Sequence, residues 1–314
     1  MKIGLYSITY LGVWYRGPAL TLEQLLERAR EYGYDGVEID GKRPHGNPLD
    51  LPARRCREIR RRAADAGLEI YAVAANNDFT SPIPEHRESQ AVYLRELLRM
   101  TADLGAKTLR VFAAWPGVTL AADGGRYDLA QRVWRTAHQE FSDQQSWEWC
   151  RECLIEAVGW AADHGVTLAL QNHMPLITNR KDMLRMVREV GSPHLKACYD
   201  APLAKKQGVT DMKAAVREVG SLQVLTHFGG EYDEDPEGTV RGWVRNPDGS
   251  LTPEDFYLDF TRGLLEIGYA GYTGYELCHP LPKLDGVTVG LEFADRNARL
   301  AARYMRGVLK RAGG

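Results

Sequence analysis

The chain has 314 residues, of which 44% are hydrophobic and 26% charged, as in an ordinary globular protein. Its 40 basic and 42 acidic residues leave a net charge of −2, so the totals give no sign of nucleic acid or an anionic membrane as a partner. Five irregularly spaced cysteines do not make a disulfide framework, and no apolar run is long enough to span a membrane. The first residues lack the pattern of a signal peptide, and we therefore expect a cytoplasmic protein.

Short apolar runs alternate with amphipathic segments along the whole chain. Strands are predicted near residues 2–9, 35–40, 68–75, 107–113, 166–171, 195–200, 222–228 and 272–277. Helices are predicted near residues 21–33, 52–66, 86–104, 146–164, 179–190, 211–219, 254–266 and 290–311, and most of them end in a glycine. Eight such repeats in about 300 residues favour a closed barrel over an open sheet. We predict an α/β fold, a (β/α)8 TIM barrel, in a single domain spanning residues 1–314.

Two connections after strands are longer than a compact barrel needs. They run from about 115 to 145 and from about 229 to 252. Long loops at the carboxyl ends of strands cover a site or form an interface, and the sequence leaves both open for the first connection.

Four consecutive strand-like runs end in a residue that can bind a metal ion. These residues are Gln171, Asp200, His227 and Glu276. Strand propensity does not require such endings, and the carboxyl ends of parallel strands meet at one edge of a barrel. Three oxygen donors and one imidazole suit Mn²⁺, Mg²⁺ or Co²⁺, whereas Zn²⁺ more often takes further His or Cys ligands. We expect one divalent ion per chain, with Mn²⁺ favoured.

The motifs around these residues resemble the sugar phosphate isomerase/epimerase superfamily, the xylose isomerase-like TIM barrels. The resemblance rests on the segments that end at Gln171, Asp200, His227 and Glu276, and on an early Gly-Val-Glu38-Ile segment. It covers essentially the whole chain and is closest to keto-sugar epimerases and to members that act on 3-oxo-glycosides. The resemblance implies a small carbohydrate substrate, a homo-oligomer and metal ligands at these four positions. It leaves open whether a second subunit completes the site.

The chain departs from the ketose epimerases at the first ligand position. They have a carboxylate where this chain has Gln171, and an amide cannot accept a proton. The remaining candidates for proton transfer are Glu276 and His173, which lies two residues beyond Gln171 and is expected to point the same way. The alternative for His173 is a residue that orients Gln171 or a water.

Three further residues are candidates for substrate binding. Trp14 and Trp115 fall in loops after strands, where aromatic rings stack on sugars. Glu38 lies within an apolar strand, where it either binds a substrate hydroxyl or pairs with Arg110 inside the barrel.

Three functions are consistent with this sequence. The first is a metal-dependent sugar or keto-sugar isomerase or epimerase that works through a metal-stabilised enediolate. The second is a lyase that cleaves the O- or C-glycosidic bond of 3-oxo-glycosides by β-elimination at the same site. The third is a sugar-binding barrel with a degenerate site and no catalytic activity.

Overall fold

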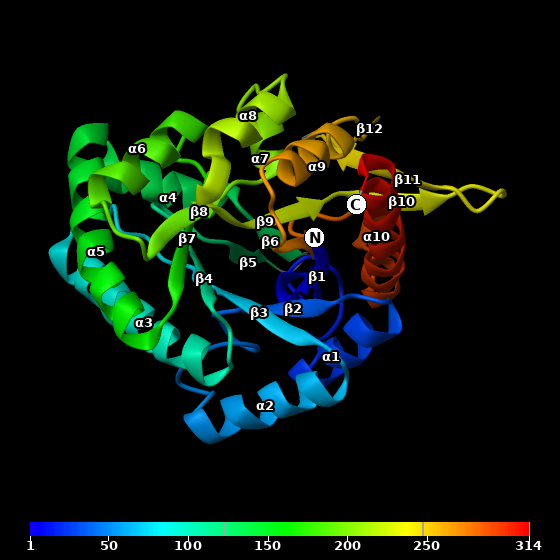
Figure 1. Ribbon diagram of the computed structural model, residues 1–314, viewed down its shortest axis with the longest axis horizontal. Coiled ribbons are helices and arrows are strands. Elements are labelled where there is room, and N and C mark those ends of the chain that lie inside the picture. Colours follow the sequence, from blue (N-terminus) through cyan, green and yellow to red (C-terminus); the bar gives the residue numbers. More distant parts are fainter. Residues whose placement is uncertain (122–123, 247, 314) are drawn as a thin grey trace.

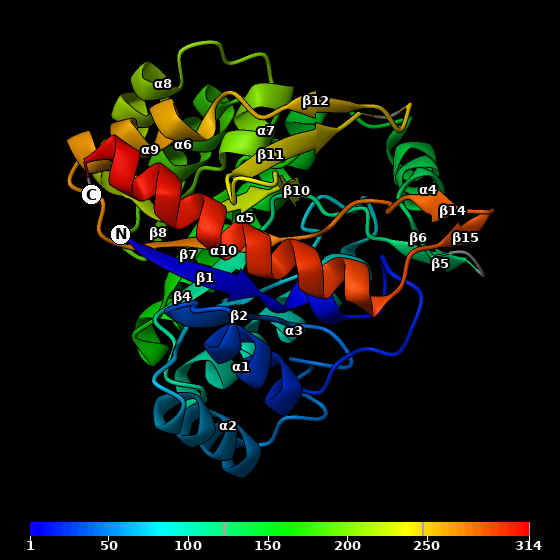
Figure 2. The ribbon, with the colours of Figure 1, turned by 90° about the vertical axis from the view of Figure 1, so that its right-hand side faces the viewer.

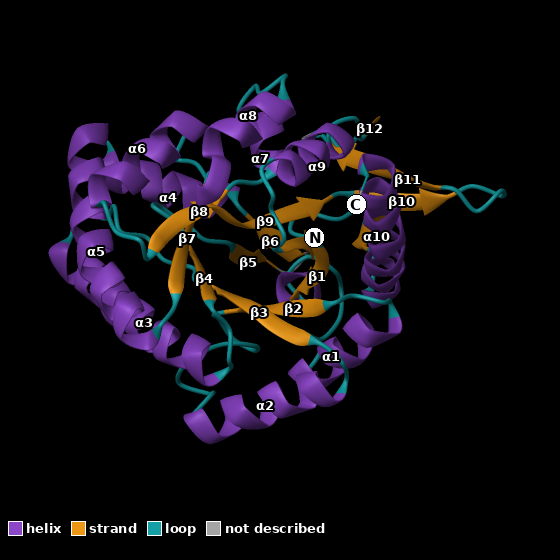
Figure 3. Cartoon of the chain, viewed as in Figure 1, coloured by secondary structure: helices purple, strands orange, loops and turns teal. Residues whose placement is uncertain are grey.

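The computed structural model describes residues 1–121, 124–246 and 248–313. Eight parallel strands close into a barrel, and helices surround it (Figures 1 and 3). The barrel strands are β1 (Lys2–Tyr6), β2 (Gly36–Asp40), β3 (Glu69–Ala74), β4 (Thr108–Val111), β7 (Thr167–Gln171), β8 (Leu195–Cys198), β9 (Gln223–Gly229) and β13 (Tyr272–Glu276). Their order around the barrel is β1-β13-β9-β8-β7-β4-β3-β2. The predicted TIM barrel and its eight strands are confirmed.

Eight helices lie where the sequence predicts them, within a few residues at their ends. They are α1 (Leu22–Glu31), α2 (Ala53–Asp65), α3 (Pro84–Asp103), α5 (Asp143–His164), α6 (Arg180–Val190), α8 (Met212–Val219), α9 (Tyr257–Glu266) and α10 (Leu291–Ala312). Thr21 and Gln24 form a reciprocal capping box at the start of α1, which satisfies two backbone N–H groups that the helix leaves unpaired.

Both long connections contain secondary structure of their own. The first forms the hairpin β5 (Thr119–Ala121) and β6 (Gly124–Arg126), followed by α4 (Asp128–His138). The second forms an antiparallel sheet of β10 (Glu231–Glu234), β11 (Val240–Arg245) and β12 (Leu251–Pro253). The remaining short elements are the 3-10 helices η1 (Ser7–Tyr10) and η2 (Gly220–Leu222), the helix α7 (Ala201–Lys206) and the hairpin β14 (Lys283–Leu284) and β15 (Val287–Thr288). Figure 2 shows both hairpins and α4 together at one end of the barrel.

A small apolar cluster fills the barrel interior, separate from the large core between the strands and the helices. Its buried members are Tyr71, Ala72, Ala169, Cys198, Leu225 and Tyr272. The rings of Tyr71 and Tyr272 stack with centroids 4.1 Å apart. Gly274 is required beside them, because a Cβ there would lie 2.5 Å from the Tyr71 hydroxyl. This cluster closes the barrel below the carboxyl ends of the strands.

Candidate active site

The predicted metal ligands lie one layer above this interior cluster. Side chains alternate along a strand, so a residue two positions beyond an inward-facing one also faces inward. Gln171 follows Ala169 in this way, Asp200 follows Cys198, and His227 follows Leu225. Glu276 ends β13, the next strand around the barrel. The sequence therefore brings all four residues to one sector of the carboxyl edge.

His227 lies between two carboxylates. Its Nδ1 is 3.0 Å from Oδ2 of Asp200, and its Nε2 is 2.7 Å from Oε2 of Glu38. All three side chains are fully buried. Burial alone would lower the pKa of His227, but the charges of Glu38 and Asp200 raise this pKa well above its usual value. Burial alone has the opposite effect on a carboxyl group and would raise the pKa of Asp200. The interactions of Asp200 with His227 and Gln171 outweigh burial and hold this pKa below its usual value.

Gln171 bridges Arg110 and Asp200. Its Oε1 accepts a hydrogen bond of 2.8 Å from Nη1 of Arg110, and its Nε2 donates to Oδ2 of Asp200. The orientation of the amide is set by its neighbours, because a guanidinium can only donate and an ionised carboxylate can only accept. The carbonyl oxygen of Gln171 therefore faces Arg110 and not Asp200 and His227. Its role as a metal ligand stays a prediction.

Arg110 completes a closed ring of five buried side chains. Its Nε lies 3.2 Å from Oε1 of Glu38, so contacts run from Glu38 through Arg110, Gln171, Asp200 and His227 back to Glu38. Arg110 also donates a 2.6 Å hydrogen bond from Nη2 to the hydroxyl of Tyr6. With His227 protonated, two positive side chains balance two carboxylates. The ring therefore neutralises its own charges inside the barrel.

Of the two roles predicted for Glu38, the structure shows the ion pair with Arg110. Glu38 is completely buried and contacts Arg110 and His227. The structure provides the ion pair expected from the sequence, and a contact of Glu38 with substrate stays a prediction.

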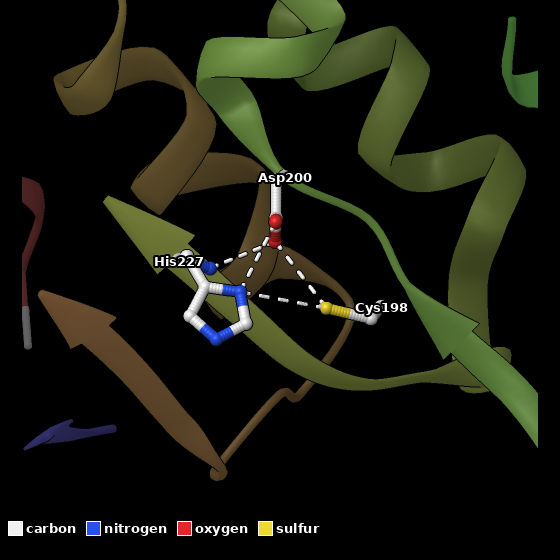
Figure 4. A group of neighbouring side chains, drawn as sticks. All are labelled: Cys198, Asp200 and His227. Atoms are coloured by element: carbon white, nitrogen blue, oxygen red, sulfur yellow. Dashed lines mark hydrogen bonds and ion pairs between the residues drawn. The ribbon is translucent and has the colours of Figure 1, made fainter. Parts of the chain in front are cut away.

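Cys198 joins Asp200 and His227 in the one group of described residues whose side chains could together hold a metal ion (Figure 4). Its Sγ lies 3.4 Å from Oδ1 of Asp200 and 3.6 Å from Nδ1 of His227. A carboxylate, an imidazole and a thiol are donors that divalent transition metals accept, so the donor set fits such an ion. Cys198 was not among the residues chosen from the sequence, although it ends β8 two residues before Asp200, and alternation along the extended chain places both on the same face.

Glu276 lies near this group without joining the ring. The carboxyl group interacts electrostatically with His227, Arg110, Asp200 and Glu38, and the thiol of Cys278 forms a hydrogen bond with it. Burial raises the pKa of Glu276 above its usual value, and the nearby carboxylates of Asp200 and Glu38 act in the same direction.

His173 belongs to an aromatic wall beside the ring. Its imidazole meets the rings of Phe112 and Trp115 edge-on, each with centroids 5.1 Å apart. The Nδ1 of His173 hydrogen-bonds to the carbonyl of Met174, so this nitrogen carries the proton and Nε2 keeps a free lone pair. Burial lowers the pKa of His173 to about 4, below the ordinary value assumed from the sequence.

Tyr127 connects the two predicted tryptophans. The ring of Trp115 meets Tyr127 edge-on at 6.1 Å, and the ring of Trp14 packs against the same tyrosine at 4.9 Å. Trp14 is only 2% exposed, whereas Trp115 is partly exposed. Of the two predicted stacking residues, Trp115 has the more accessible ring.

A family model supports the resemblance seen in the motifs. The model described as "Xylose isomerase-like TIM barrel" matches residues 26–297. The chain belongs to this family. No curated protein matches the chain.

Solved structures of sugar epimerases share the fold over nearly the whole chain. A D-psicose 3-epimerase determined with D-fructose superposes with a TM-score of 0.71 at 16% identity, covering 98% of this chain and 99% of that one. An L-ribulose 3-epimerase gives 0.69 at 17% identity, with 99% and 95% covered. A 3-keto-D-glucoside 4-epimerase from E. coli gives 0.66 at 19% identity, with 98% and 99% covered. At these identities the likeness establishes the fold alone.

No described helix is long and apolar enough to cross a membrane.

Proposed function

We propose that the protein is a divalent-metal-dependent sugar or keto-sugar isomerase or epimerase. The observation that carries this proposal is the convergence of Asp200, His227 and Glu276 at the carboxyl edge of a barrel whose relatives act on keto-sugars. The sequence favours Mn²⁺ at this site, with Mg²⁺, Co²⁺ and Zn²⁺ as the alternatives.

When bound, a divalent ion supplies a Lewis acid that withdraws electron density from a substrate oxygen. In the proposal Asp200 and His227 would hold the ion. Gln171 and Glu276, the other two ligands expected from the sequence, lie on the adjoining strands. Arg110 orients Gln171 by donating to its amide oxygen, and Glu38 orients His227 through its Nε2.

His173 and Glu276 have the positions for proton transfer. His173 has a free lone pair on Nε2 and accepts a proton from the substrate carbon next to the carbonyl. Loss of that proton leaves an enediolate. Return of a proton to the opposite face of the same carbon gives the epimer, and return to the neighbouring carbon gives the isomer. Glu276 is the second proton-transfer group, on the strand adjacent to His227. Trp115 borders the space for the sugar, and the buried Trp14 supports Trp115 through Tyr127.

The lyase alternative is favoured by one specific feature. Gln171 supplies no carboxylate, and its amide is held at both ends, so a symmetric pair of carboxylate bases is missing. A single base with a separate acid suits β-elimination, in which the base removes the α-proton and the acid protonates the departing glycosidic oxygen.

The test is exchange of substrate hydrogen with solvent deuterium, followed by NMR on chelator-treated protein with and without added Mn²⁺, Co²⁺ or Zn²⁺. Free ketoses and 3-keto-glycosides are the two substrate panels. Metal-dependent exchange with an epimeric or isomeric product supports the proposal, and release of an aglycone supports the lyase. Asp200→Asn should abolish exchange, whereas Asp259→Asn, at an exposed ion pair with Arg262, is the matched control. Binding of sugar without exchange in any metal form would instead indicate a sugar-binding barrel.

A further inference from the structure

Cys198, Asp200 and His227 bring a sulfur, a carboxylate oxygen and a ring nitrogen within 4.8 Å of one another. Metal–sulfur bonds of about 2.3 Å and metal–nitrogen or metal–oxygen bonds of about 2.0–2.1 Å give tetrahedral edges of about 3.6 Å to sulfur and about 3.3 Å between nitrogen and oxygen. The Cys198 sulfur lies 3.6 Å from Nδ1 of His227 and 3.4 Å from Oδ1 of Asp200, and Nδ1 lies 3.0 Å from Oδ2 of the same carboxylate. One ion above this triangle can reach all three donors with only small movements.

The second ring nitrogen of His227 has the partner that a metal-binding histidine needs. Its Nε2 lies 2.7 Å from Oε2 of Glu38, which can only accept when ionised. The Nε2–H therefore donates to Glu38, and Nδ1, which faces Asp200 and Cys198, is the nitrogen left for a metal. Carboxylates commonly orient metal-binding histidines in this way.

The amide of Gln171 directs its NH2 group, and not its oxygen, towards Asp200. Its NH2 group, which cannot bind a cation, faces Asp200, and its oxygen is held by Arg110. Turning the amide over would set its NH2 against the guanidinium and its oxygen against the carboxylate. Both contacts would then be repulsive.

We propose that the metal centre consists of Cys198, Asp200 and Nδ1 of His227, with Gln171 outside the coordination shell as a positioning residue for Asp200. The inference rests on the proposed function only in requiring a bound ion. As the sulfur–metal and nitrogen–metal bonds form, the thiol proton of Cys198 and the Nδ1 proton of His227 leave to solvent, and the Nε2–H stays hydrogen-bonded to Glu38. The thiolate and the carboxylate then balance the charge of a divalent ion.

A thiolate donor changes which ion the site prefers. Three protein ligands with an open fourth position are typical of catalytic zinc sites, and sulfur favours Zn²⁺ or Co²⁺ over Mn²⁺ and Mg²⁺. This centre therefore takes Zn²⁺ or Co²⁺ rather than the Mn²⁺ favoured by the sequence, and its fourth position accepts a substrate oxygen.

Cobalt binding tests the proposal without using activity. Metal-free protein is titrated with Co²⁺, and the near-ultraviolet absorption of a cobalt–thiolate bond is recorded together with the metal content. The band should appear in the wild type and in Cys153→Ser, a partly buried thiol on α5, and disappear in Cys198→Ser. Loss of the band in Cys278→Ser alone would overturn the proposal, because it would assign the sulfur to the residue beside Glu276.

Different outcomes test the Cys198 centre and the metal-dependent activity. Bound Co²⁺ without a thiolate band would overturn the Cys198 centre and leave a metal-dependent enzyme standing, whereas absence of any bound ion would overturn both. X-ray absorption of the zinc-loaded wild type provides a check that needs no variant. It should show one sulfur neighbour at about 2.3 Å, and only nitrogen and oxygen neighbours would contradict the proposal.

Metal preference provides a third readout. Cys198→Ser should lose at least about tenfold in affinity for Zn²⁺ and much less for Mn²⁺, because sulfur contributes mainly to binding of the softer ion. Equal losses for both ions would contradict the proposal, since they would indicate a general disturbance of the site.

Discussion

Gln171→Glu tests the arrangement of the buried ring most directly. In the wild type the amide NH2 donates to Asp200 and the amide oxygen accepts from Arg110. The substitution keeps the shape and the contact with Arg110, but it places a second carboxylate oxygen against Asp200. Without an ion between them, the two carboxylates repel each other inside the barrel.

The size of the effect follows from the contact distance. Two charges about 3 Å apart repel by about 5 kcal/mol at an effective dielectric constant of about 20. The stronger, charge-assisted bond to Arg110 offsets about 2 kcal/mol of this. The net loss is about 3 kcal/mol, which for a chain of 314 residues lowers the melting temperature by about 5 °C.

The pH dependence has a definite sign. Repulsion raises the pKa of the introduced carboxyl in the folded state, so the variant is least destabilised below the ordinary value of about 4.5 and loses stability as the pH rises above it. Calorimetry of chelator-treated protein should therefore show the full deficit at pH 8 and a smaller one at pH 5.

Gln144→Glu is the matched control. Gln144 also donates to a carboxylate, that of Glu148, at 2.9 Å, but this pair lies on the surface of α5. Solvent screens the new repulsion there, and the expected loss is below about 0.5 kcal/mol. If metal-free Gln171→Glu melts no lower than this control at pH 8, the contact between Gln171 and Asp200 is not as described.

Three further predictions use different parts of the molecule. His173→Ala should keep its metal and lower kcat by about 10² to 10⁴, the range for one general base, while loss of the metal would mean that the residue supports the ion instead. Asp200→Ala should lose the ion in metal analysis, and full occupancy would refute its assignment as a ligand. Burial opposes ionisation of Glu231, but His279 and Arg245 lower its pKa to about 2, so it contributes about 3 kcal/mol that is present above pH 4.5 and lost as the pH falls towards 2. Denaturant titrations should show Glu231→Gln to be less sensitive than the wild type to pH in this range.

The fold and the location of the site could be predicted from the sequence because both depend on local patterns. Alternating apolar runs fix the strands. Glu276 ends its strand and Asp200 follows two residues after the end of its strand, so both side chains lie at the carboxyl edge whatever their neighbours are. The capping box of Thr21 and Gln24 depends only on residues three apart.

The contacts within the site could not be predicted in the same way. The orientation of the Gln171 amide is set by Arg110, which is 61 residues away in the sequence. The low pKa of His173 arises mainly from burial in the assembled structure. Alternation along the strand could have indicated Cys198, but a cysteine at a buried strand position is usually only a small apolar residue, and its contact with His227 requires the register between β8 and β9.

The charges within the ring balance one another, so the barrel does not need a bound metal ion in order to fold. Many small metal-binding domains are unfolded without their ion, because their ligands have no other partners. Here Arg110 and protonated His227 already compensate Glu38 and Asp200, so newly made chains can complete the barrel in a compartment that is short of the ion. If the protein takes up the proposed ion, its loading is therefore a step separate from folding of the barrel.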